Sequence, residues 1–261
     1  MAPTIVVIRH AEGIHNVLGD WTKRDPGLTS VGLTQCANIQ EDFQNSRIDV
    51  VIASPLRRTI MTALLCFGPH LGEDKRIILL PSLQEISGDP SSTGSTIEQI
   101  VGEFGDQIID IQTYMTPGWE STGEARSSHP NVIRERARKA RLAIREIAQE
   151  QASTNNPDPV IAVVTHGNFI PYLTGDFSQP GYSQGSVWTN TEFRTFRFQK
   201  PNSAIQKGRA RLVETEDSLA GRGARVATEA EQAAGRALTE NHTNRLGQAA
   251  ANGRTTLAPS S

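Results

Sequence analysis

Four short runs of apolar, mostly β-branched residues recur along the chain, and polar positions follow each of them. They cover residues 5–8, 50–53, 77–80 and 160–164. Continuous apolar runs of this length are typical of strands buried on both faces of a sheet. Between the runs, apolar positions at helical spacing predict helices over 31–43, 57–71, 96–104 and 130–148. The alternation indicates an α/β three-layer sandwich with a mainly parallel central sheet and helices on both faces.

The pattern changes near residue 198. Residues 186–198 alternate in polarity, which predicts one or two further strands. From residue 199 onward the chain has no Phe, Trp or Tyr, and such a segment buries little apolar area to offset its ordering entropy. Residues 229–238 have helical propensity that Gly235 weakens. We expect an α/β domain over 1–200, with a cap inserted at about 86–130, and a flexible or partly helical C-terminal tail over 201–261.

Bulk composition excludes several classes of partner. The chain has 261 residues, a net charge of -2 and a pI near 6.3, so it lacks the positive charge that attracts nucleic acid or anionic membranes. Its apolar runs are too short to span a bilayer, and its first residues lack the basic start of a signal peptide. We expect a cytoplasmic protein with a small-molecule substrate and no nucleic-acid or membrane partner. Its oligomeric state stays open.

Polar side chains follow each strand-like run. Arg9 and His10 follow the first, Arg58 comes shortly after the second, Glu85 after the third and His166 after the fourth. The carboxyl ends of parallel strands meet at one edge of a sheet, where ligands bind. An imidazole beside guanidinium groups suits attack on a phosphorus centre whose oxygens carry negative charge. The sequence has no cluster of acidic residues that would indicate a metal site, so we expect no metal ion and no other cofactor.

These motifs resemble those of the histidine phosphatase superfamily, also called the phosphoglycerate mutase-like family. Its Arg-His-Gly, with Asn six residues after the His, stands here as Arg9-His10-Ala11 with Asn16. Residues 54–63 match its Ser-x-Leu-x-Arg-x-x-x-Thr-Ala motif. Glu85 stands where the family has an acid after the third strand, and His166-Gly167 matches its late His-Gly. The resemblance covers about residues 4 to 198. One departure is Ala11, which adds a methyl group beside the phosphate loop.

The resemblance implies a role for each motif residue. His10 would attack the phosphorus as a neutral imidazole. Arg9, Arg58 and a protonated His166 would bind the phosphoryl oxygens and stabilise charge in the transition state. Glu85 would protonate the leaving alcohol and later accept a proton from water.

Further residues are implied as substrate-binding. Asn16 would be a neutral donor at the rim, and Gly167 would lie beside the phosphate. Trp119 and Arg126 lie in the segment that, in the resembled family, roofs the pocket and sets substrate preference. Packing within the cap is the alternative for Trp119.

The identity of the acid stays open at this point. Asp89 lies four residues past Glu85, and Glu12 lies two residues past His10. We favour Glu85 over both because it directly follows the third strand in the resembled pattern.

Together these features predict a metal-independent phosphomonoesterase that acts on a small phosphorylated metabolite through a phosphohistidine intermediate. Two alternatives remain. The same pocket could be repurposed for a non-phosphoryl reaction, such as dehydration or hydrolysis of a carboxylate-bearing small molecule, or the chain could be a phosphoglycerate-type mutase.

Overall fold

Seven strands form one sheet in the order β4-β3-β2-β5-β1-β6-β7. The structure, a computed structural model, describes residues 3–72, 76–105, 109–121, 127–153, 156–178, 188–201 and 203–251. The strands are β1 (Thr4–Arg9), β2 (Val50–Ala53), β3 (Ile77–Leu79), β4 (Ile109–Asp110), β5 (Val160–Thr165), β6 (Phe193–Phe198) and β7 (Leu212–Glu214). The first five pair in parallel, whereas β6 and β7 are antiparallel. The predicted α/β fold with a mainly parallel sheet is confirmed.

The strand β5 lies at the centre, in parallel between β1 and β2. Its register with β1 runs from Thr4 opposite Val160 to Arg9 opposite Thr165. The carboxyl ends of β1, β2, β3 and β5 therefore point to the same edge of the sheet. This edge is where the predicted site residues begin.

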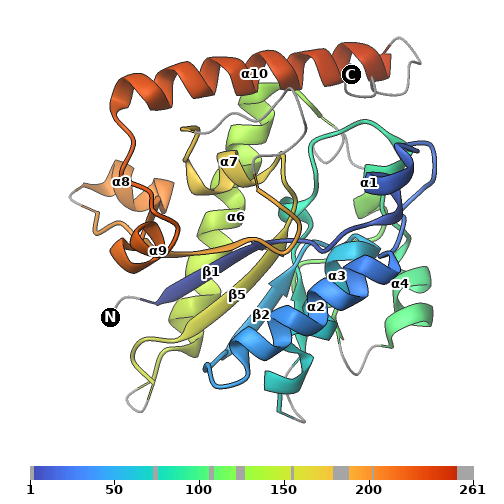
Figure 1. Cartoon of the computed structure of the whole chain (residues 1–261), viewed down its shortest axis with the longest axis horizontal. Coiled ribbons are helices and arrows are strands. Elements are labelled where there is room, and N and C mark those ends of the chain that lie inside the picture. Colours follow the sequence, from blue (N-terminus) through green and yellow to red (C-terminus); the bar gives the residue numbers. More distant parts are fainter. Residues whose placement is uncertain are drawn as a thin grey trace.

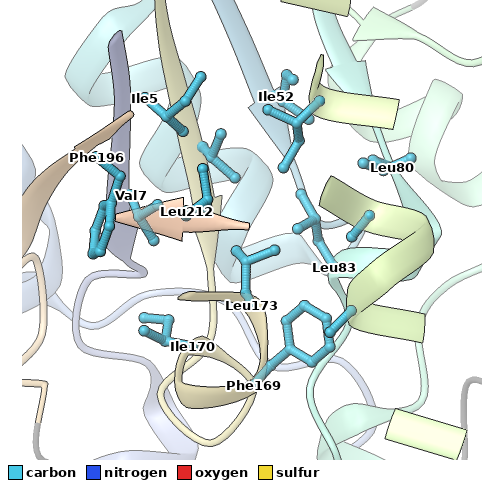
Figure 2. Close-up of a cluster of buried hydrophobic side chains, with 14 of the residues drawn as sticks. Ile5, Val7, Ile52, Leu80, Leu83, Phe169, Ile170, Leu173, Phe196 and Leu212 are labelled. Atoms are coloured by element: carbon cyan, nitrogen blue, oxygen red, sulfur yellow. The ribbon is translucent and has the colours of Figure 1, made fainter. Parts of the chain in front are cut away.

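Helices cover both faces of the sheet (Figure 1). The helices α2 (Ser30–Phe43), α3 (Arg57–Phe67) and α4 (Ile97–Phe104) bury apolar residues on one face, and α6 (Pro130–Gln151) and α7 (Ile170–Thr174) on the other. Successive side chains of β1 point to opposite faces of the sheet. Ile5 and Val7 therefore join one core cluster, and Val6 and Ile8 join the other. Figure 2 shows part of the first cluster, where Ile5 and Val7 lie near Phe196 and Leu212. Full burial of one such side chain contributes about 1.5–3 kcal/mol.

Helix ends depart slightly from the sequence prediction. The N-cap of α2 is Thr29, whose hydroxyl accepts from the Gly32 N–H. The helix α3 ends at Phe67, and the 3-10 turn η1 (Gly68–His70) follows because Pro69 occupies its first turn. Pro130 begins α6, as expected, but the helix continues to Gln151.

The segment predicted as a cap contains short elements. They are η3 (Pro90–Ser92), α4, β4 and η4 (Trp119–Ser121). The strand β4 pairs with β3 as an edge strand, so part of this segment extends the sheet. The remaining short elements are α1 (Ile14–Leu18), η2 (Pro81–Leu83), α8 (Ala204–Arg209) and α9 (Glu216–Gly221).

The C-terminal segment is helical, as one alternative predicted, but it also packs on the domain. The strand β7 pairs with β6, and Leu212 is 5% exposed within the core cluster of Figure 2. The helix α10 (Glu229–Ala251) runs across one end of the molecule (Figure 1). The expectation of a flexible tail that begins at residue 201 is therefore corrected.

Specific contacts explain how a segment without aromatic residues is held. Gln232 accepts from the Phe177 N–H at 2.7 Å, and the Tyr172 and Thr243 hydroxyls lie 3.2 Å apart. A Cβ at Gly235 would lie 1.6 Å from the Phe177 carbonyl oxygen, so glycine allows the close approach of α10. Gly235 was expected only to weaken the helix, whereas here it permits the contact. No helix in the described part of the chain is long and apolar enough to cross a membrane.

Candidate active site

The nucleophile predicted from the sequence, His10, directly follows β1 and is 2% exposed. Its backbone N–H donates to Thr165 O at 2.9 Å, and Asn190 donates to its carbonyl oxygen at 2.9 Å. Its ring Nδ1 lies 2.7 Å from Ala11 O. A carbonyl can only accept, so the proton belongs on Nδ1 and the lone pair on Nε2. Nε2 is therefore the ring nitrogen that carries the lone pair.

The loop after His10 is held from α3. The Ala11 N–H donates to the Thr62 hydroxyl oxygen at 3.0 Å, and that hydroxyl donates to Arg58 O at 2.7 Å. Ala11 is fully buried, and its methyl group joins the core cluster on the α2 and α3 side. The departure from glycine at this position is therefore accommodated by packing.

His166 follows β5, and its ring centroid lies 5.2 Å from that of His10. Its Nε2 lies 2.9 Å from Ser54 Oγ. Burial first, then Arg58 and His10, holds the pKa of His166 well below its usual value. The lowered pKa favours a neutral imidazole in the ligand-free site, whereas the sequence predicted a protonated His166 that donates to a bound phosphoryl group. If Nε2 accepts from the Ser54 hydroxyl, the proton on Nδ1 remains available to a ligand.

Two arginines supply positive charge beside His10. Arg58 is buried in α3 and donates to Ser91 O at 2.8 Å, while Arg9 donates to Trp188 O. Burial lowers the pKa of Arg58 to about 10 and also lowers the pKa of Arg9, so both stay charged at neutral pH. The Nε groups of both arginines are buried without a partner among the described residues. Orphaned buried donors are rare, so this pair indicates a site for an anion.

Burial and positive charge also act on His10. Burial, followed by Arg58 and Arg9, holds the pKa of His10 well below its usual value. The imidazole is neutral at physiological pH as a result. A nucleophile needs this form.

Glu85 lies in the loop after β3 and η2 and is half-buried. Its two carboxylate oxygens accept from the Ile86 N–H at 2.9 Å and the Asn168 N–H at 3.2 Å. Its charge raises the pKa of both Arg9 and Arg58, so the carboxylate lies within electrostatic range of the two guanidinium groups.

The two competing acids have other partners. The Asp89 carboxylate accepts from the Ser87 hydroxyl at 2.5 Å. The Glu12 carboxylate accepts at 2.6 Å from Thr29, the N-cap of α2. The geometry favours Glu85 as the acid.

The four residues predicted to bind substrate have different surroundings in the structure. Asn16 accepts from the Gly13 N–H at 2.9 Å and thus closes the first turn of α1. Gly167 is buried directly after His166, in the turn between β5 and α7. Trp119 is 1% exposed and packs against Gly94 within the core, so its assignment as a specificity residue is corrected to cap packing. Arg126 lies outside the described residues.

Sequence reasoning missed several residues of the site. Ser54 and Thr62 belonged to the quoted motif, yet their hydroxyls were given no role. His15 was also missed, although a second histidine beside the motif Asn16 is visible in the sequence. Its ring centroid lies 5.7 Å from that of His10.

In the described part of the chain, His, Cys, Asp and Glu side chains form no group of three that could hold a metal ion. Cys36 and Cys66 are free, buried thiols on α2 and α3.

Known proteins resemble this chain in sequence and in fold. The sequence profile of the histidine phosphatase superfamily (branch 1) matches residues 5–211. This chain belongs to that superfamily. The match covers the strands from β1 to β6 and all the site residues named above, and it ends one residue before β7.

Curated relatives match over shorter stretches. Phosphoglycerate mutase-like protein 1 of Arabidopsis thaliana is 38% identical over 77 residues, which cover 25% of this chain and 27% of the relative. Phosphoserine phosphatase 1 of Hydrogenobacter thermophilus is 26% identical over 102 residues, which cover 38% of this chain and 46% of the relative. The alignments thus span less than half of each relative's length.

Solved structures show the same fold. The ecdysone phosphate phosphatase from Bombix mori has a TM-score of 0.56 at 15% identity, and covers 77% of this chain and 96% of its own. Mycobacterial hydrolase 2 has a TM-score of 0.51 at 19% identity, and covers 91% of this chain and 98% of its own. At these identities the likeness shows the fold alone.

Proposed function

We propose that this chain is a metal-independent phosphomonoesterase that acts on a small phosphorylated metabolite through a phosphohistidine on His10. One observation carries the proposal: the Ala11 carbonyl fixes the His10 proton on Nδ1, next to two arginines with unpartnered Nε groups. This arrangement offers a neutral nucleophile and preorganised donors for an anion. Membership of the superfamily supports the same reading.

The first half of the reaction transfers the phosphoryl group to the enzyme. The lone pair on His10 Nε2 forms a P–N bond while the P–O bond to the substrate alcohol breaks. Glu85, in its acid form, gives its proton to the departing oxygen. Arg9, Arg58 and the Nδ1 proton of His166 bind the nonbridging oxygens and stabilise their charge.

The second half regenerates the enzyme. A water molecule attacks phosphorus and gives its proton to the Glu85 carboxylate as the P–N bond breaks. Inorganic phosphate leaves, and His10 returns to its neutral form. The arginines supply the positive charge that a metal ion would otherwise provide.

The test is turnover and covalent trapping. Purified protein should hydrolyse p-nitrophenyl phosphate in the presence of EDTA, orthovanadate should inhibit it, and His10→Ala should abolish turnover. A ³²P-labelled substrate quenched in alkali should leave label on wild type and none on His10→Ala, because the P–N bond is base-stable. Loss of activity on chelation, restored by Mg²⁺ or Zn²⁺, would contradict the metal-independent mechanism.

The role of Glu85 can be tested by the leaving group. Glu85→Gln should keep much of its rate with p-nitrophenyl phosphate, whose leaving group barely needs a proton, and lose about 100-fold or more with an alkyl phosphate. Asp89→Asn is the matched control and should behave as wild type with both. The reverse result would make Asp89 the acid.

A substrate screen separates the remaining readings. Phosphoserine and other small phosphoesters belong in it because a phosphoserine phosphatase is among the relatives. Transfer of the label to a phosphoglycerate instead of water would indicate a mutase. If no phosphoester turns over while His10→Ala abolishes a reaction of a phosphate-free carboxylic acid, the pocket has been repurposed. A cytoplasmic location is part of the proposal, and cell fractionation checks it.

A further inference from the structure

His15 is a third histidine in the catalytic cluster, and no motif assigns it a role. It lies in α1 and is 3% exposed. Its ring centroid lies 5.7 Å from that of His10, and the edge of Trp21 packs against it at 5.1 Å. The imidazole therefore has the proposed nucleophile and the Trp21 ring as neighbours.

Electrostatics place His15 in the same cluster. A positive charge on His15 would lower the pKa of both His10 and His166, so the three rings lie within electrostatic range of one another. In turn burial, followed by Arg58 and Arg9, lowers the pKa of His15 to about 2. The ring is thus neutral at physiological pH and adds no positive charge that would weaken the His10 nucleophile.

The packing of Gly13 identifies the nitrogen that can serve a ligand. A Cβ at Gly13 would lie 2.7 Å from His15 Cε1 and 2.8 Å from Nδ1, so this edge of the ring lies directly against the Gly13 backbone. Nδ1 is buried and has no partner among the described residues. A buried N–H without an acceptor is rarer than a bare lone pair. The proton therefore belongs on Nε2, the nitrogen on the other side of Cε1.

A hydrogen-bonded pair of loops connects His15 with Arg58. The Ser91 N–H donates to Trp21 O at 3.1 Å, and the carbonyl oxygen of Ser91 accepts from Arg58 at 2.8 Å. The loop that presents Trp21 to His15 is thus tied to the loop that orients the guanidinium group. The same two hydrogen-bonded loops therefore position both His15 and Arg58.

We propose that His15 contacts the substrate, donating from its Nε2–H to a nonbridging oxygen of the phosphoryl group. This inference rests on the proposed phosphatase function and adds a neutral donor to the two arginines. The donor serves the transferred group, so its contribution is independent of the leaving group. His15 would then be a catalytic residue in addition to the motif residues.

The first test compares two substitutions. His15→Phe keeps an aromatic ring beside Trp21 and removes the donor, whereas His15→Gln keeps an N–H at about the position of Nε2. We expect His15→Phe to lower kcat/KM for p-nitrophenyl phosphate and the affinity for orthovanadate by about tenfold or more, and His15→Gln to recover part of both. The loss should be the same for a phenyl and an alkyl phosphate. Wild-type kinetics and vanadate affinity in a folded His15→Phe would overturn the inference.

A second variant covers the case in which His15→Phe does not fold. Gly13 has an extended backbone (φ -97°, ψ 157°) that alanine tolerates, so Gly13→Ala introduces only the methyl group that displaces the His15 ring. We expect the same loss of vanadate affinity in Gly13→Ala. An unchanged affinity there would equally overturn the inference.

Histidine NMR separates this inference from the proposed function. In wild-type protein labelled with ¹⁵N-histidine, the His15 ring should be the Nε2-protonated tautomer, and its resonances should move when orthovanadate is added. If these shifts occur but no phosphoester turns over, the phosphatase proposal fails while the anion contact stands. If phosphoesters turn over and the His15 resonances stay fixed, the function stands and the role of His15 is wrong.

Discussion

Thr62→Val offers a direct measurement of how α3 holds the catalytic loop. The Thr62 hydroxyl accepts from the Ala11 N–H at 3.0 Å and donates to Arg58 O at 2.7 Å, and both Thr62 and Ala11 are fully buried. Valine has the same shape but neither hydrogen bond. The Arg58 carbonyl keeps its helical partner, so the main loss is a buried Ala11 N–H without an acceptor.

The size of the effect follows from that orphaned donor. A buried polar group left unsatisfied costs about 1–3 kcal/mol of unfolding free energy. In a chain of this size each kcal/mol lowers Tm by roughly 2–4 °C. Catalysis should suffer as well, because the carbonyl of Ala11 orients His10. A displacement of about 1 Å at a reacting group can lower the rate about 100-fold.

The assay pairs thermal unfolding with turnover of p-nitrophenyl phosphate. Thr62→Ser is the matched control, because serine keeps the hydroxyl and loses only a methyl group. We expect Thr62→Ser to retain most of the activity and Thr62→Val to lose it by about 10- to 100-fold. If Thr62→Val unfolds and turns over like wild type, or if serine is as damaging as valine, the hydroxyl does not hold the loop.

Three further predictions concern stability. A chain ending at Lys200 loses β7 and α10 and should unfold several degrees below one ending at Ala251; equal Tm values would mean that the C-terminal elements contribute nothing. Gly94→Ala should lower the urea-unfolding free energy by about 1–3 kcal/mol, because its Cβ would lie 2.2 Å from Trp119 Cη2; no loss would show that the ring can move. The three site histidines have lowered pKa values, so below pH 6.5 the unfolded state binds protons that the folded state does not. The unfolding free energy should therefore fall as the pH falls, by up to about 1.4 kcal/mol per pH unit for each histidine. His15→Phe has one such histidine fewer, so its unfolding free energy should depend less steeply on pH.

The fold and the strand-end residues could be predicted because the sequence signal is local. Apolar runs followed by polar residues predict the strands, and parallel strands bring their carboxyl ends to one edge. Arg9, His10, Arg58 and His166 come together there for that reason. The acid could be ranked but not decided, since three carboxylates lie near the motifs in sequence. The contacts of Glu12 with Thr29 and of Asp89 with Ser87, and the effect of the Glu85 charge on Arg9 and Arg58, are visible only in the folded chain.

Other features depend on tertiary contacts that leave little sequence signal. The segment after residue 201 looked unable to pack, because its composition is polar and small. It packs through one strand pairing, a few side-chain hydrogen bonds and the close approach at Gly235. The lowered pKa of His166 likewise depends first on its burial, which no motif encodes. Trp119 could have lined either the pocket or the core, and the space left by Gly94 decides for the core.

The electrostatic balance of the site explains why neutral histidines and charged arginines occur together. Arg9 and Arg58 keep their charge despite burial, because an arginine remains protonated at neutral pH even when its pKa falls to about 10. Burial comes first in lowering the pKa of all three imidazoles, and the charges of Arg58 and Arg9 add to it for His10 and His15, as that of Arg58 does for His166. A phosphoryl group that enters the site therefore meets fixed positive charge for its oxygens and an unprotonated nitrogen for its phosphorus. Removal of either arginine would weaken anion binding and also raise the pKa of His10, so an Arg58→Ala variant should move the acid limb of the pH–rate profile to higher pH. An unchanged acid limb, in a folded variant that binds vanadate more weakly, would show that the charge of Arg58 does not help to keep His10 neutral.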